Sequence, residues 1–495
     1  MRYLVLIAPL IVLSACQKTE TPAAEQAVAA ASAPAPGSVA APVQATEVCD
    51  GDGAWLQANF QASHGAIPDG TADCAFYQAA WQHFLEATEG PDPKQVAFLK
   101  YPDVAGLFGA AATPLSPVQK SGMGTAALKV VQLPNDPSGT KLAAFDAGVR
   151  QAGNPQGILV DRNGNPIFYS IHVNPAFQSF TTVNHLVTAD QLRNAPPTLA
   201  INDGAPGSDG KPVKLGVAEY KAAWQIVEDS AHAPNGFITQ VALVPTIHRN
   251  GDALTLDAAH PRQVTLALIS FHVAFTLDNH PEMIWATFEH LAADSTADKP
   301  FSDVAPSAVS RPPAAPVISN PERNYTLFAA NSAVAQANAP ADPHAFDEAS
   351  QKFKSPTPIY RVYPGSKVNE DDVDDAIVAL DKWMANHVPT LDVRRNYRLI
   401  GAVWLKKPGM FAPGKHFFNK DGQSSDDADA MLSGEAALSS TAMESFTQAP
   451  DSQPHCFSCH DTALVRSSPA PGKVLVTAKE VNVSHVMSRF LSELP

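Results

Sequence analysis

A Cys-Phe-Ser-Cys-His run at residues 456–460 is the feature that most constrains this chain, and 495 − 460 = 35 residues follow it. Two cysteines that flank two residues and precede a histidine form the attachment motif of a c-type haem. In such a motif Cys456 and Cys459 form thioether bonds to the haem vinyl groups, and His460 presents its imidazole to the iron as the proximal ligand. The sequence therefore predicts one covalently bound haem c.

Two other kinds of site use a Cys-x-x-Cys pair. A redox-active dithiol belongs to a thioredoxin-like βαβ unit, but no strand is predicted before Cys456 and no long helix after Cys459. A zinc site needs a second pair of soft ligands, and the other three of the 5 cysteines lie far upstream. The pattern therefore favours haem over both alternatives.

The position of the motif also limits the fold. A small cytochrome c domain wraps helices around its haem downstream of the motif, and 35 residues are too few for that wrap. We therefore expect a short C-terminal haem-attachment segment that docks against a large body, and not a stand-alone small cytochrome c domain. The body would supply the pocket walls and the other iron ligand.

The first residues are typical of an exported protein, as covalent haem attachment requires. Arg2 provides a positive charge, and residues 3–13 form an apolar run that is too short to span a bilayer stably. The Leu-Ser-Ala-Cys run that ends at Cys16 resembles a lipobox, which implies cleavage before Cys16 and acylation of that residue. Resemblance to known lipoproteins implies the outer membrane, facing the periplasm. The alternative is an ordinary signal peptide in which Cys16 has no role.

Two further cysteines, Cys49 and Cys74, remain after lipid and haem have used the other three. In an oxidising periplasm two such residues are expected to form a disulfide. The alternative is a pair of free thiols, because the sequence does not show that their Cα atoms approach.

Composition divides the chain into four parts. Residues 1–15 are expected to be the lipoprotein signal peptide, and residues 16–47, rich in Ala and Pro, a tether without a core. Residues 48–450 are expected to form a β-rich α+β body with peripheral helices, and residues 451–495 the haem-attachment segment. The formal net charge of −15 disfavours nucleic acid as a partner and suits a basic redox partner protein, although acidity also serves solubility.

Periodicity locates the main elements of the body. Apolar residues at three- and four-residue steps predict helices over 72–87 and 373–387, with His83 outside the stripe and at the surface. Two β-prone runs around Asn163-Gly164 predict a hairpin over 157–173. Further strands are expected at 236–247, 263–275, 283–288 and 397–405.

The other axial ligand of the iron decides between electron transfer and catalysis. Met443 lies shortly before the motif and is the first candidate, with packing in the core as its alternative. His272 and His290 are weaker candidates, and each is alternatively a structural histidine with hydrogen bonds. Glu289 next to His290 would suit an acid–base pair, but adjacent residues of a strand point to opposite faces. His485 and Met487 in the final segment are outside possibilities.

Three runs resemble a known family: residues 157–164, residues 279–290, and residues 441–446 ahead of the Cys-Phe-Ser-Cys-His run. They are similar to a group of large monohaem cytochrome c family proteins, many of them lipoproteins, that Gram-negative bacteria export. Met283 departs from the pattern, because the family often has Trp there. The resemblance covers most of the chain after Cys49, and it implies haem binding and electron transfer.

Two function classes follow from these observations. The first is a periplasm-facing, lipid-anchored cytochrome that transfers electrons to or from a partner protein. The second is a haem-dependent oxidoreductase, oxidase or peroxidase-like, with an open distal position on the iron.

Overall fold

The computed structural model describes a mixed α+β fold that is rich in β-strands and is unlike a small helical cytochrome. The residues described are 49, 53–56, 65–68, 71–90, 96–108, 149–153, 157–228, 236–290, 338–357, 375–406, 412–414, 432–434, 440–447, 455–463, 465–466 and 474–491. The expected signal peptide, the tether and Cys16 lie outside these residues. All elements below belong to one compact unit, Thr46–Pro495.

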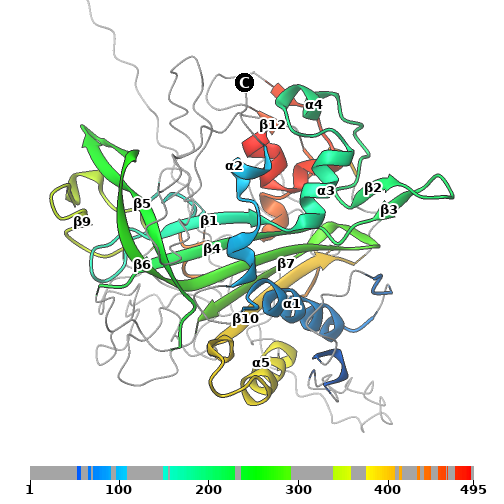
Figure 1. Ribbon diagram of the computed structural model, residues 1–495, viewed down its shortest axis with the longest axis horizontal. Helices are drawn as coiled ribbons and strands as arrows, with labels where there is room; N and C mark the ends of the chain where they lie inside the picture. The colour runs from blue at the N-terminus through cyan, green and yellow to red at the C-terminus, as the bar shows by residue number, and fades with distance from the viewer. Residues whose placement is uncertain are drawn as a thin grey trace, which may run out of the picture. The chain divides into compact units, whose positions relative to one another are not determined.

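An antiparallel sheet of seven strands is the centre of this unit (Figure 1). Its order is β1-β4-β6-β7-β10-β11, and β5 pairs with the long strand β6. The strands are β1 Phe168–Val173, β4 Ala218–Ile226, β5 Thr239–Asn250, β6 Ala253–Leu277, β7 His280–His290, β10 Tyr397–Leu405 and β11 Leu432–Gly434. Small hairpins flank the sheet: β2 Asp203–Pro206 with β3 Pro212–Lys214, β8 Phe346–Asp347 with β9 Lys352–Phe353, and β12 Val465–Arg466 with β13 Val474–Val476.

Short helices complete the element list. The α-helices are α1 Asp73–Ala87, α2 Val104–Leu107, α3 Pro175–Val183, α4 Ala189–Asn194 and α5 Asp375–His387. The 3-10 turns are η1 Ala54–Leu56, η2 Ala97–Lys100, η6 Pro343–Ala345, η7 Val393–Asn396, η9 Cys456–Ser458 and η10 Glu480–Val483, and η11 Val486–Leu491 is a π-helix. None of the helices that the structure describes has the length and apolar character needed to cross a bilayer.

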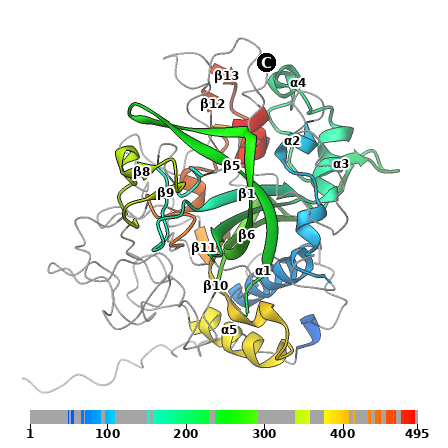
Figure 2. The same ribbon diagram turned by 60° about the vertical axis from the view of Figure 1, so that its left-hand side comes forward.

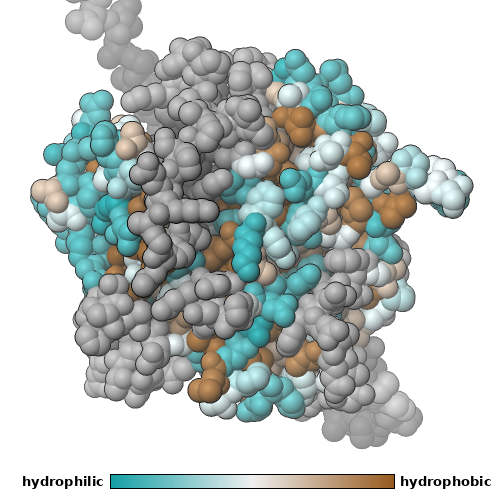
Figure 3. Space-filling model, viewed as in Figure 1, coloured by the Kyte–Doolittle hydropathy of each residue, from teal (hydrophilic) through white to brown (hydrophobic). Residues whose placement is uncertain are grey.

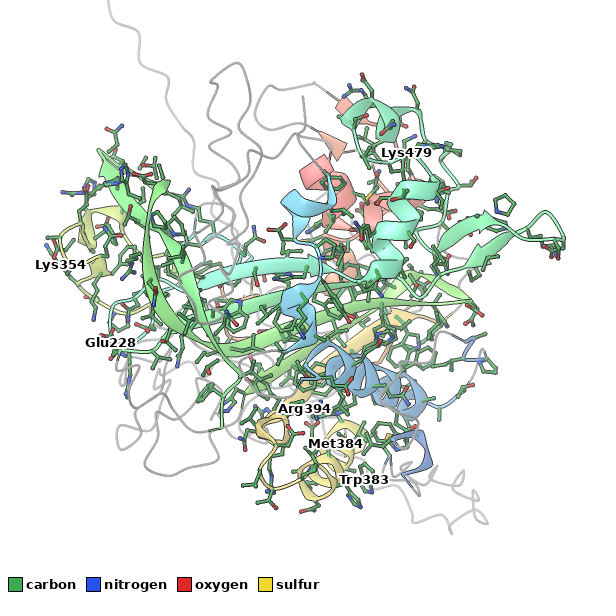
Figure 4. The ribbon with its side chains drawn as sticks, in the orientation of Figure 1. Glu228, Lys354, Trp383, Met384, Arg394 and Lys479 are labelled. Atoms are coloured by element: carbon green, nitrogen blue, oxygen red, sulfur yellow. A yellow bond between two sulfur atoms is a disulfide. The ribbon has the colours of Figure 1, made fainter. Side chains whose placement is uncertain are left out.

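The sheet separates two hydrophobic clusters. On one face α1 contacts β6, β7 and β10, and α5 contacts α1 and β10. On the other face α3, α4 and the C-terminal residues cover side chains that include Trp285 and Val403. Figure 2 shows α1 and α5 on one side of the curved sheet, and α3, α4 and β13 on the other. In Figure 4 Met384 of α5 lies below the sheet and Lys479 of the C-terminal segment lies above it.

The predicted strands at 236–247, 263–275, 283–288 and 397–405 are confirmed as β5, β6, β7 and β10. The predicted helices are confirmed as α1 and α5. The hairpin over 157–173 is smaller than predicted: the turn at Asn163-Gly164 forms, but Val160 and Pro166 make only an isolated bridge, and β1 pairs with β4 instead.

The surface position predicted for His83 is wrong. Its side chain is buried and stacks on Phe275, with 4.0 Å between the ring centroids. The helix α1 lies between the sheet and α5, so more than one stripe of its surface is covered. A periodicity argument that assumes a single buried face places His83 outside.

The side of the molecule where α3, α4 and the C-terminal residues cover the sheet also carries hydrophobic surface near the edge of the sheet. Figure 3 shows hydrophobic side chains among hydrophilic ones over α3, α4 and β2. Among the described residues in this region, Val183 of α3 and Val213 of β3 are exposed. The helix α3 begins where the Asn174 side chain accepts a hydrogen bond from the Phe177 backbone N–H, with Pro175 as its first residue.

Candidate functional site

The motif forms a tight turn around Cys456. The backbone N–H groups of Cys459 and His460 both donate to the Cys456 carbonyl, at 3.1 and 2.9 Å. Within the motif Phe457 is fully buried, Cys456 is half-buried and Cys459 is exposed. Neither cysteine forms a disulfide. The buried Phe457 ring packs the turn against the body.

The imidazole of His460 is oriented by a backbone carbonyl. Its Nδ1 lies 2.9 Å from the carbonyl oxygen of Val483. A carbonyl oxygen only accepts, so Nδ1 carries the proton and Nε2 keeps a lone pair in the neutral ring. A histidine that ligates iron needs this arrangement, because its second nitrogen donates to an acceptor that sets the ring orientation. The residues present therefore fit a haem held at this motif.

Two aromatic rings contact this histidine. The Trp285 ring lies 3.8 Å from the His460 ring between centroids, and the His485 ring lies 3.7 Å from it at an interplanar angle of 24°. The indole N–H of Trp285 donates to the Glu282 carbonyl at 3.1 Å, and His485 Nε2 lies 3.1 Å from the Cys459 carbonyl. These contacts restrict rotation of the His460 ring.

The C-terminal segment that supplies Val483 is packed on the sheet. The turn η10 contacts β7, and η11 contacts α4. Apolar side chains of this segment are buried in the same cluster as Trp285 and Phe457: Val481, Val483, Val486 and Met487. Lys479, labelled in Figure 4, is buried as well, and its Nζ donates to the Ala195 carbonyl. The motif and the carbonyl that orients its histidine thus both rest on one sheet face.

His272 lies on the same sheet face, in β6, and both of its ring nitrogens have partners. Nε2 lies 2.9 Å from Glu444 Oε1, and Nδ1 lies 2.7 Å from Thr287 Oγ1. The carboxylate of Glu444 is close enough to Cys456 to act on its thiol: burial raises the pKa of Cys456 well above its ordinary value, and Glu444 and Cys459 raise it further. The structure therefore pairs His272 with Glu444, and the charge of Glu444 acts on the Cys456 thiol.

Met443 belongs to a turn, residues 440–447, that the sheet holds in place. The Thr441 backbone N–H donates to Glu289 Oε1 at 2.7 Å, and the Tyr169 hydroxyl donates to the Ala442 carbonyl at 2.7 Å. Met443 is buried, and its backbone N–H donates to Ser440 Oγ at 3.1 Å. The next residue, Glu444, contributes to the raised pKa of Cys456, so the charge carried by this turn acts on the motif.

His290 lies elsewhere. Its Nε2 is 2.8 Å from the Gly236 carbonyl, and its ring stacks on Phe237 at 3.5 Å between centroids. Burial lowers the pKa of His290 to about 3, against the opposing effect of the Gly236 carbonyl. Glu289 points to the opposite face, toward Thr441, as alternation along β7 requires. The structure does not bring His290 to the motif, nor does it join Glu289 and His290 in an acid–base pair.

Cys49 and Cys74 form the predicted disulfide, with their Cα atoms 5.3 Å apart. Across the part of the chain that the structure describes, no group of three or more His, Cys, Asp or Glu side chains is placed to hold a metal ion directly. The geometry therefore adds nothing in favour of the zinc alternative for Cys456 and Cys459.

Sequence reasoning missed two carboxylates of this site. Glu219 of β4 is buried beneath the C-terminal segment, where Ser484 Oγ donates to its Oε2 at 2.5 Å. Glu444 follows Met443 directly. Glu219 is an acidic residue between Ala218 and Tyr220, and that contrast is a signal in the sequence. Glu444 stands among Ser and Thr residues and has no such signal.

Comparisons of this chain with protein-family models, with curated proteins and with solved structures found no match. The resemblance to large monohaem cytochrome c family proteins therefore rests on the three runs of sequence named above.

Proposed function

We propose that this chain is a c-type cytochrome that binds one haem c covalently through Cys456 and Cys459, with His460 as the proximal iron ligand, and that it transfers electrons. The observation that carries the proposal is the hydrogen bond from His460 Nδ1 to the Val483 carbonyl. With Nδ1 as the donor, Nε2 is the ring nitrogen that would ligate iron, within a motif whose spacing suits thioether attachment. The haem, when bound, supplies a one-electron couple at iron.

The chain's own residues orient and shield the ligand. The Val483 carbonyl fixes the plane of the His460 imidazole. By accepting a hydrogen bond from Nδ1–H, it also makes the ring a stronger electron donor. His485 stacks on the ring, Trp285 contacts it at a tilt, and Phe457 keeps the motif against the sheet. A ligand that does not reorient needs little rearrangement when the charge on the iron changes, which favours rapid electron transfer.

The proposal extends to location and partner. Cys16 is the proposed lipid attachment site, which would anchor the protein to the outer membrane facing the periplasm. A redox partner protein is the proposed source or destination of the electrons. Replacing Cys16 by Ala should move the protein from the membrane fraction to the soluble periplasmic fraction, while haem attachment is unchanged.

Covalent attachment is tested by haem staining of a denaturing gel after expression in a host that matures c-type cytochromes. The wild-type chain should stain and carry the mass of one haem. The Cys456→Ala, Cys459→Ala double variant should lose both signals, and the Cys49→Ala, Cys74→Ala variant is the matched control that should keep them. Haem staining that survives the loss of Cys456 and Cys459 would refute the proposed attachment.

A haem-dependent oxidoreductase is the second candidate, and the pair of His272 and Glu444 favours it. A histidine and a carboxylate 2.9 Å apart beside the motif resemble an acid–base pair that moves protons at a haem pocket. Carbon monoxide distinguishes the two candidates. A reduced spectrum that is low-spin and unchanged by carbon monoxide supports electron transfer, whereas a high-spin spectrum that shifts supports an open iron site.

A further inference from the structure

The carboxyl group of Glu219 lies in a place where an acidic residue is costly. It belongs to β4, is 8% exposed, and faces the C-terminal segment. Its cross-strand neighbours in the sheet are Val173 and Ala274, and neither carries a charge. An apolar residue of similar size would fill this space at lower cost in desolvation. The partner of Glu219 therefore indicates what the carboxyl group does.

That partner is Ser484, 265 residues away in sequence. Ser484 is fully buried, its Oγ donates to Glu219 Oε2 at 2.5 Å, and the same Oγ accepts from the Val486 backbone N–H at 3.2 Å. Ser484 also donates its backbone N–H to the Val481 carbonyl at 3.3 Å. These three bonds fix both the side chain and the backbone of Ser484.

The position of Ser484 decides the direction of the Val483 carbonyl. The carbonyl of Val483 and the N–H of Ser484 belong to one planar peptide unit, so neither turns without the other. The Val483 oxygen lies 2.9 Å from His460 Nδ1. A chain of contacts thus runs from the sheet through Glu219, Ser484 and Val483 to the imidazole.

We propose that Glu219 is a positioning residue for the iron ligand: through Ser484 it sets the hydrogen bond between the Val483 carbonyl and His460, and thereby the reduction potential of the haem. This inference rests on the proposed function of the Cys456–His460 motif. A carbonyl that accepts a hydrogen bond from Nδ1–H increases electron donation by the ring and favours ferric iron. A Val483 carbonyl that is held less firmly weakens electron donation by the His460 ring and raises the reduction potential of the haem.

The test is the reduction potential of the full-length haem protein, measured by spectroelectrochemistry. Glu219→Ala and Ser484→Ala should each raise the potential. The double variant should match the single ones, because both substitutions break the same chain of contacts. Glu219→Gln should stay near the wild-type value, because its amide oxygen still accepts from Ser484. Ser170→Ala is the control, since it removes another buried hydrogen bond of the sheet, to Trp224 Nε1 at 3.0 Å, that does not involve the motif.

Two results would overturn the inference. One is haem attachment with an unchanged potential in both Glu219→Ala and Ser484→Ala. The other is a shift of equal size in Ser170→Ala, which would assign the effect to general loosening of the sheet. If Glu219→Ala does not fold, Ser484→Ala, which removes one hydroxyl, still decides the question.

A second measurement separates this inference from the proposed function. Nitrogen-15 NMR of histidine-labelled full-length chain without haem reports which ring nitrogen of His460 carries the proton. The wild-type chain should hold the Nδ1–H form, and Ser484→Ala should give a mixture of forms. If the wild-type chain acquires no haem, the proposed function fails, and this measurement alone judges the link from Glu219 to His460. An unchanged tautomer in Ser484→Ala would then refute it.

Discussion

At the scale of single residues, hydrogen bonding distinguishes the candidate distal ligands. Both ring nitrogens of His272 have partners, Glu444 and Thr287, so ligation would break a partly buried pair. His290 faces the other side of the sheet. The thioether of Met443 is a weak acceptor that needs no hydrogen bond, and Met443 is followed by Glu444, whose charge raises the pKa of the Cys456 thiol. Met443 is therefore the distal ligand that we propose.

Replacing Met443 by Ala should change the reduced optical spectrum from low-spin to high-spin and open the iron to carbon monoxide. His272→Ala is the matched variant, and it should leave the low-spin spectrum in place. An unaltered spectrum in Met443→Ala, or a loss of the low-spin form in His272→Ala, would show that the assignment is wrong.

Glu219 should also make stability depend on pH. Burial raises its pKa to about 7, while the Ser484 hydroxyl acts in the opposite direction. The folded chain then holds a proton that the unfolded chain releases near pH 4, so stability is highest below that pH and falls as pH rises to about 7. The loss is of order 3 kcal/mol at most. Urea unfolding at pH 5 and pH 8 should show a smaller difference in Glu219→Gln; an equal difference in both proteins would assign the pH dependence to other groups.

At the scale of elements, short turns rather than long helices carry the site. The motif turn η9 and the turn η10 are held by side chains that enter the sheet face, with Phe457 fully buried against Trp285. On the opposite face, α1 is tied to Cys49 by the disulfide and packs Trp81 and Phe84 on Phe288. The sheet between them connects the helical layer to the layer that carries the motif.

Truncating Phe457 should loosen that connection. The Phe457→Ala change removes a fully buried ring, and we expect a loss of about 3–5 kcal/mol in the free energy of unfolding. Leu391→Ala is the control, because Leu391 is 95% exposed and its loss should change stability by less than about 0.5 kcal/mol. Equal unfolding midpoints for Phe457→Ala and the wild-type chain would mean that the turn is not anchored by this ring.

At the scale of the whole molecule, charge would shape the encounter with the proposed redox partner. The formal net charge of −15 should attract a small basic redox protein over distances beyond contact. Dissolved salt screens such attraction, with a Debye length of about 10 Å at 0.1 M ionic strength. The acidity also serves solubility. The salt dependence of the electron-exchange rate distinguishes steering of a partner from solubility alone.

The second-order rate of electron exchange with a basic monohaem cytochrome should fall as ionic strength rises from about 0.01 to 0.5 M. An acidic partner of similar size is the control, and its rate should rise under the same change. A rate with the basic partner that does not respond to salt would show that the net charge has no part in the encounter.

Local pattern predicted much of the fold. Alternating apolar residues located β5, β6, β7 and β10, and helical periodicity located α1 and α5. The strand β4 was missed because three of its nine residues are alanines, which have a low β propensity. The helix α3 was missed although Asn174-Pro175 is a start signal, and His83 was misplaced because its helix is covered on two sides.

By itself the sequence determined the chemistry proposed for this protein, because two thiols and an imidazole in five consecutive residues need no distant partner to suit a haem. It also determined the strands β5, β6, β7 and β10, since alternation is local. Only the tertiary structure decided what surrounds the imidazole. The His460 ring contacts Val483 and Trp285 directly, and Glu219 is linked to it through Ser484. Glu219 and Ser484 are 265 residues apart in sequence. Such contacts depend on how the C-terminal segment docks on the sheet, and no local pattern records that.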